Sequence, residues 1–93
     1  MGEEEPPAPR GGYTSLEAVL DSTISIAAGA TFNYFVPGVS LAYNAAMAAA
    51  WGLGGIIGDL FWRNKSGTAM AGRFVNDSFS FFGGNYLLPA LYR

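Results

Sequence analysis

The sequence predicts an all-α integral membrane protein with two or three transmembrane helices, short loops and an extended N-terminal tail. No charged residue occurs in the 37 positions from Ser22 to Gly58, and no Lys or Arg occurs from Gly11 to Trp62. Soluble domains carry about one charged residue in four. Hydrophobic residues make up 51% of the 93 residues and charged residues only 13%. A soluble chain of this length buries only about 60–65% of its unfolded surface, so a bilayer is the better solvent for it.

The chain opens with an acidic segment that is rich in Pro and Gly. Residues 1–13 contain no apolar run, and we expect an extended tail in solvent or along a partner. A membrane helical domain follows over residues 14–93. Thr14 or Ser15 is expected to cap its first helix, because Glu17 lies in the first turn, where the helix dipole favours a negative charge.

Three helical segments are predicted, at about 16–36, 40–62 and 68–92. Pro37-Gly38 ends the first, because proline disfavours a helical residue before it and glycine permits a turn. The second has 23 residues, which extend about 34 Å and exceed a hydrocarbon core of about 30 Å. A polar loop at 63–67 precedes the third segment.

The first segment is long enough to span a bilayer but carries two acids near its start, Glu17 and Asp21. Its uncharged part begins only at Ser22 and ends at Val36. The sequence leaves open whether it spans the membrane or lies at the interface.

Small residues recur every four positions along one face of the second segment. This ridge consists of Ala42, Ala46, Ala50, Gly54 and Gly58. Small side chains let another helix backbone approach closely in membranes. A polar and small ridge recurs in the first segment at Asp21, Ser25, Gly29 and Asn33. The turn could fold one ridge onto the other, and the ridge on the second segment is the predicted contact face for other subunits.

Three cations lie around the second loop and predict how the chain is oriented across the membrane: Arg63, Lys65 and Arg73. Basic loops favour the cytoplasmic or matrix side of a membrane. We therefore expect residues 63–73 on that side.

Three acids lie near the ends of the segments, where water or lipid headgroups would reach them: Asp21, Asp59 and Asp77. Asp59 can pair with Arg63 and Asp77 with Arg73, because residues four apart are neighbours on a helix. We interpret these acids as structural, and Trp51, in the middle of the second segment, as packed against protein.

Residue content argues against enzymatic chemistry. The chain has no His and no Cys, and no nucleophile–base pair or metal-ligand cluster is evident, so no catalytic, cofactor or metal site is predicted. Residues 52–58 are rich in glycine but lack nucleotide-loop spacing. The few cations are scattered, which disfavours nucleic acid. An Ala/Gly-lined groove could hold a lipid acyl chain.

Three stretches resemble the small two-helix membrane-arm accessory subunits of mitochondrial respiratory complex I. They are Gly55–Arg63 (GIIGDLFWR), Thr68–Arg73 (TAMAGR) and Phe81–Leu87 (FFGGNYL). Together they cover less than half of the chain, and Gly72 stands where the family has His. The resemblance implies a scaffolding subunit without redox groups of its own.

The predicted function is therefore that of a non-catalytic accessory subunit of an inner-membrane complex of the respiratory chain, in mitochondria. Its partners would be other membrane subunits and lipids. The alternative is a small homo-oligomeric pore or holin-like protein of a bacterial inner membrane, with Ser25, Asn33 and Asn44 lining a wet path. A soluble helical domain is the third possibility.

Overall fold

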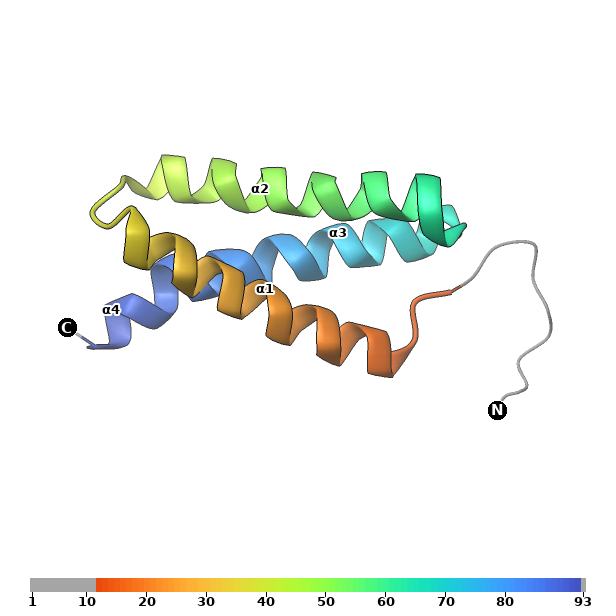
Figure 1. Ribbon diagram of the computed structural model, residues 1–93, viewed down its shortest axis with the longest axis horizontal. Helices are drawn as coiled ribbons and strands as arrows, with labels where there is room; N and C mark the ends of the chain where they lie inside the picture. Colours follow the sequence, from red (N-terminus) through yellow and green to blue (C-terminus); the bar gives the residue numbers. More distant parts are fainter. Residues whose placement is uncertain (1–11, 93) are drawn as a thin grey trace.

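The computed structural model describes residues 12–92 as a bundle of three long helices (Figure 1). Helix α1 spans Ser15–Phe35, and α2 spans Leu41–Gly58 and continues into the π-helical turn η1, Asp59–Arg63. Helix α3, Gly67–Phe82, continues through a second π-helical turn, η2 (Gly83–Leu87), into α4 (Leu88–Tyr92). The all-α class and the three helical segments are thus confirmed. Residues 1–11 of the predicted tail lie outside the described residues.

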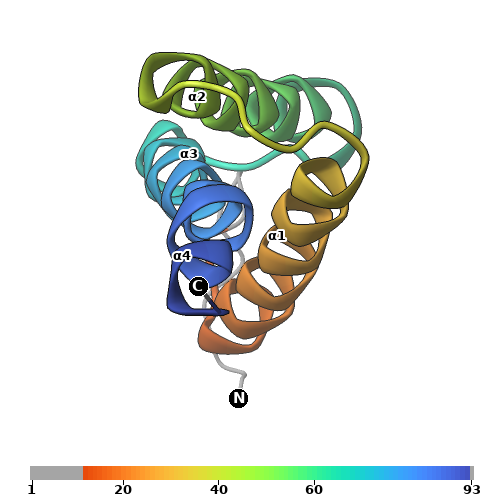
Figure 2. The same cartoon turned by 90° about the vertical axis from the view of Figure 1, so that its left-hand side faces the viewer.

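The helices run up, down and up along a molecule of 47 × 22 × 16 Å. Seen end-on they form a triangle (Figure 2), in which α3 packs against both α1 and α2, and α1 also packs against η2. The start of α1 and the α2–α3 loop lie at one end, called here the loop end. The α1–α2 turn and α4 lie at the other end, the turn end.

The boundaries of α1 follow from local sequence. Thr14 forms a capping box with Glu17, in which each side chain bonds to the backbone N–H of the other residue. This confirms the predicted cap. The helix stops before Pro37, and Gly38 adopts φ +80°, which glycine tolerates without a steric penalty.

The second π turn has a local cause in Pro89. Proline has no N–H to donate to the carbonyl four residues earlier, which belongs to Asn85. The chain responds by widening the preceding turn, so that the Leu88 N–H bonds to the Gly83 carbonyl. The first π turn ends at Asn64, which has φ +49°, a left-handed conformation that Asn adopts more readily than most residues.

Glycines allow the backbones of α1 and η2 to touch. A Cβ on Gly29 would collide with the Phe81 carbonyl, and one on Gly84 would collide with the Ile26 carbonyl. Between α2 and α3, a Cβ on Gly52 would collide with the Ser78 hydroxyl. Close packing therefore depends on these glycines.

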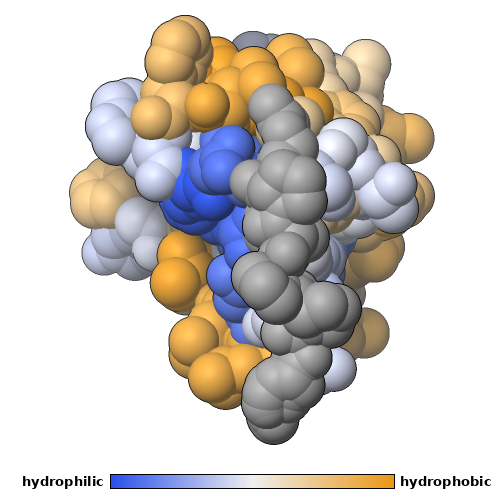
Figure 3. All heavy atoms as spheres, turned by 90° about the vertical axis from the view of Figure 1, so that its right-hand side faces the viewer, coloured by the Kyte–Doolittle hydropathy of each residue, from blue (hydrophilic) through white to orange (hydrophobic). Residues whose placement is uncertain are grey.

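The bundle has a polar interior and an apolar exterior. Among the described residues, the buried apolar side chains are Ala48, Ala69, Phe81 and Pro89, whereas 20 large hydrophobic side chains are exposed. The buried polar side chains are Asp21, Ser25, Asn44, Asp59, Lys65, Asp77 and Asn85. Figure 3 shows hydrophilic residues in the middle of the loop end with hydrophobic residues around them. By length and composition, one described helix, Leu41–Arg63, qualifies as a membrane span.

The face of α2 that packs inside differs from the predicted ridge. Asn44, Ala48 and Gly52 are buried against α3. The predicted positions are exposed at Ala42, Ala46, Ala50 and Gly54 and half-buried at Gly58. The folding of the two ridges onto each other is therefore not observed. Small residues occur on every face of α2, so their spacing could not predict which face packs inside. The packed face is the one that carries two polar residues, Asn44 and Asp59.

On α1 the predicted ridge is the packed face. Asp21, Ser25 and Gly29 are buried and Asn33 is half-buried. This face contacts α3 and η2 rather than the small ridge of α2.

Candidate functional site

The bundle interior is arranged in layers along α3. Successive inward positions, four residues apart along α3 and into η2, are Arg73, Asp77, Phe81 and Asn85. We call the group of Arg73, Asp21, Asp59 and Asp77 the ionic layer, which lies toward the loop end. We call the group of Asn33, Asn44 and Asn85 the amide layer, which lies toward the turn end. Phe81 lies between the two.

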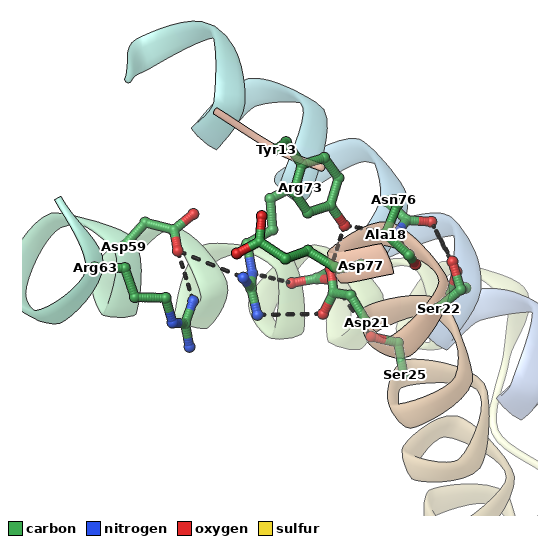
Figure 4. Close-up of polar contacts among 12 residues, drawn as sticks. Tyr13, Ala18, Asp21, Ser22, Ser25, Asp59, Arg63, Arg73, Asn76 and Asp77 are labelled. Carbon is green, nitrogen blue, oxygen red and sulfur yellow. Dashed lines mark hydrogen bonds and ion pairs between the residues drawn. The ribbon is translucent and has the colours of Figure 1, made fainter. Parts of the chain in front are cut away.

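Arg73 is the centre of the ionic layer (Figure 4). Its Nη2 lies 3.3 Å from Asp21 Oδ1 on α1, and its Nη1 lies 3.5 Å from Asp59 Oδ1 on η1. Its Nε lies 3.4 Å from Asp77 Oδ2, one turn along α3. One guanidinium therefore joins carboxylates from three elements.

The predicted pairs Asp59–Arg63 and Asp77–Arg73 are confirmed as ion pairs. The expectation that water or headgroups reach these acids is wrong, because Asp21, Asp59 and Asp77 are only 8%, 1% and 2% exposed. Arg73, predicted as an orientation residue beside the loop, lies within α3, and its side chain points into the bundle. Packing of the three helices leaves these acids little exposed, and Asp21 and Asp77 line a partly open pocket together with Arg63 and Arg73.

A hydrogen-bond network extends the ionic layer along α1. The Tyr13 hydroxyl donates to Asp21 Oδ2 at 2.6 Å and accepts from Asn76 Nδ2 at 2.7 Å. The same amide nitrogen donates to the Ala18 carbonyl at 3.1 Å, and Ser22 Oγ donates to Asn76 Oδ1 at 2.7 Å. Burial, and then the hydrogen bond to the Asp21 carboxylate, raise the pKa of Tyr13 to about 12.

A separate ion pair lies at the loop end. Lys65 Nζ lies 2.7 Å from Glu17 Oε2 and also donates to the Gly12 carbonyl at 2.8 Å. The predicted loop cation thus ties the α2–α3 connection to the first turn of α1. Arg63 remains 42% exposed while pairing with Asp59.

An aromatic layer separates the ionic and amide layers. Trp51 Nε1 donates to Ser25 Oγ at 2.8 Å, and the indole stacks on Phe81 with ring centroids 5.3 Å apart. Phe32 contacts the same ring at 5.9 Å. The prediction that Trp51 packs against protein is confirmed.

The amide layer lines a small, partly open cavity of about 120 Å³. Its lining includes Asn33 from α1, Asn44 from α2 and Asn85 from η2. Asn44 is 3% exposed and Asn85 is 1% exposed. Three of their polar atoms have no hydrogen-bond partner in the described part of the chain: Asn44 Oδ1, Asn85 Oδ1 and Asn85 Nδ2.

Sequence reasoning did not single out Tyr13, Asn76 or Asn85. A signal for Asn85 was present in its spacing, because it continues the series of inward residues four apart from Arg73. Tyr13 and Asn76 lie 63 residues apart, and no local pattern links them.

The buried acids of the described residues are held in ion pairs. The carboxylates of the ionic layer face guanidinium groups, and no group of three potential metal-ligating acids was found in residues 12–92. Comparisons with protein-family models, curated proteins and solved structures gave no match.

Proposed function

We propose that the protein is an integral membrane protein with a non-catalytic, structural role in a larger membrane assembly. The observation that carries this proposal is the polarity of the bundle, with 20 large hydrophobic side chains outside and seven polar or charged ones buried among the described residues. Exposing apolar surface to water costs about 25 cal/mol per Å². Acyl chains remove that cost, and they leave the interior as the only place where polar groups find partners.

Helix length supports the same conclusion. Helix α1 has 21 residues, and α2 with η1 has 23, so they extend about 31 and 34 Å. A bilayer core is about 30 Å thick. The charges of α1 and α3 point into the bundle or lie at the loop end, which is the usual arrangement of ionisable residues in membrane proteins.

The exposed ridge of α2 supports a role in assembly. Ala42, Ala46, Ala50 and Gly54 lie on the outside of the bundle, and a Cβ built on Gly54 meets no atom within 4 Å. Such a flat surface lets a helix of another subunit approach closely. The exposed side chains of α1 are larger, as at Leu16, Leu20 and Ile24, and suit lipid.

Placement in a respiratory-chain complex of the mitochondrial inner membrane stays a prediction that rests on the sequence resemblance to complex I accessory subunits. The stretches that carry it lie on α2–η1, the first turns of α3, and η2. No comparison adds to it.

The alternative of a homo-oligomeric pore has less support. Of its three predicted lining residues, Ser25 and Asn44 are 0% and 3% exposed inside one bundle and Asn33 is half-buried, so a path between copies would require the bundle to open. Conductance of liposomes that contain the purified protein would favour the pore and contradict the structural proposal.

The experiment that tests the proposal adds bulk to the ridge with Ala46→Leu, Ala50→Leu and Gly54→Leu together. We expect the variant to stay in the carbonate-resistant membrane fraction but to lose the larger species seen on native electrophoresis in gentle detergent. The reason is that leucines keep α2 apolar and prevent close helix approach.

A matched control adds bulk to the outside of α1 with Val19→Leu, Thr23→Leu and Ala27→Leu, all at exposed positions. This control should keep the larger species. A ridge variant that assembles normally would contradict the contact face, and release of the wild-type protein by carbonate would contradict the membrane proposal.

A further inference from the structure

The cavity of the amide layer lies inside the bundle at the turn end. Its lining also includes Val39 from the α1–α2 turn, and Tyr86 and Pro89 beyond α3. Because the lining residues come from all three helical segments, the cavity is a product of the tertiary fold.

The cavity is too polar to be dry. Apolar cavities stay empty, whereas buried polar groups without protein partners are satisfied by water. Asn44 Oδ1 and Asn85 Oδ1 are acceptors and Asn85 Nδ2 is a donor, and none of them bonds to any residue in the described part of the chain. A buried polar group without a partner carries the full penalty of its lost hydration.

The cavity also has the necessary size. A cavity needs only about 10–15 Å³ of water-accessible volume to hold one water molecule, so a volume of about 120 Å³ gives room for several. A buried water makes about three hydrogen bonds, and the three carboxamides supply both donors and acceptors.

We propose that the Asn33–Asn44–Asn85 cavity is an internal water-binding site, where a cluster of long-lived waters joins α1, α2 and η2 by hydrogen bonds. The site is distinct from the ionic layer, because Phe81 and Trp51 stack between them. The waters satisfy amides that the helices leave without partners. The proposal rests on the buried amides of Asn44 and Asn85, whose partners are missing whether or not a bilayer surrounds the bundle.

Magnetisation transfer from water to side-chain amides tests the site. Full-length protein labelled with ¹⁵N-asparagine, folded in detergent micelles, would be examined by NOE and ROE spectroscopy. We expect water cross-peaks of opposite sign in the two spectra at the Asn44 and Asn85 amides, which distinguish bound waters from surface water that exchanges rapidly.

Asn76 is the internal control. Its amide nitrogen already donates to Tyr13 and Ala18, so it should show no long-lived water. The absence of cross-peaks at both Asn44 and Asn85, in a spectrum that resolves the Asn76 amide, would overturn the proposal.

A cavity-filling variant provides a second test. Val39→Phe adds a ring at the cavity wall and should abolish the water cross-peaks at Asn44 and Asn85 without changing the Asn76 signal. Unchanged cross-peaks in a folded variant would place the water elsewhere and overturn the assignment. If this variant does not fold, the wild-type spectra alone decide.

Discussion

At the scale of single residues, Arg73 is the main cation that faces the buried carboxylates of the interior. It faces three carboxylates at 3.3–3.5 Å, and its side chain is only 15% exposed. Arg63 gives Asp59 a second cation, whereas Asp21 and Asp77 have no ion pair with another cation among the described residues. Removing one partner of a buried ion pair leaves an uncompensated charge, which costs more than the pair itself contributes.

We therefore predict that Arg73→Met lowers the free energy of unfolding by about 3–5 kcal/mol. The measurement is a denaturation titration of the purified protein in micelles. Arg63→Met is the matched control and should cost less, because Asp59 keeps Arg73 and Arg63 is half-exposed.

A compensating variant makes this prediction sharper. Arg73→Met combined with Asp21→Asn and Asp77→Asn removes the charges together and should recover part of the lost stability, since buried ion pairs are often replaceable as a unit. Equal losses for Arg73→Met and Arg63→Met would show that Arg73 is not the central cation.

At the scale of helices, the contact between α1 and η2 depends on the absence of side chains. Gly29 faces the backbone of Phe81 and Asn85, and Gly84 faces the backbone of Ile26 and Ala30. Pro89 sets the π turn that holds Gly84 at this point. Backbone atoms cannot rotate away as a side chain can, so even one methyl group must separate the helices.

Gly29→Ala is expected to destabilise the fold by about 1–3 kcal/mol, the usual cost of overpacking. The same denaturation titration checks it. Gly54→Ala is the control: its Cβ meets open space, and alanine favours helix over glycine by about 0.5–1 kcal/mol, so stability should stay equal or rise. A Gly29→Ala protein as stable as wild type would contradict the close backbone contact.

At the scale of the whole molecule, the polarity is the reverse of a water-soluble bundle. Its long axis measures 47 Å, enough to cross a bilayer with both ends in the headgroup regions. The loop end holds the Glu17–Lys65 pair and the turn end holds Pro37-Gly38. In the proposed membrane orientation, all three helical segments span the bilayer.

This orientation predicts which sites face the same side. The sequence has no Cys, so single cysteines can report accessibility without background. In sealed vesicles, an impermeant maleimide should label Gly12→Cys and Thr68→Cys from one side and Pro37→Cys only from the other. Labelling of Gly12→Cys and Pro37→Cys from the same side would show that α1 does not cross.

Local sequence was enough to predict the three helical segments, a first cap at Thr14 or Ser15, the end of α1 near Pro37 and the pairs Asp59–Arg63 and Asp77–Arg73. All of these depend on neighbours within about one helical turn. The inward face of α2 could not be predicted in this way, because small residues surround that helix. The contact between Asp21 and Arg73 joins residues 52 positions apart and likewise depends on how the helices pack. Contacts of that range depend on how three helices pack together, and neither periodicity nor composition specifies that packing.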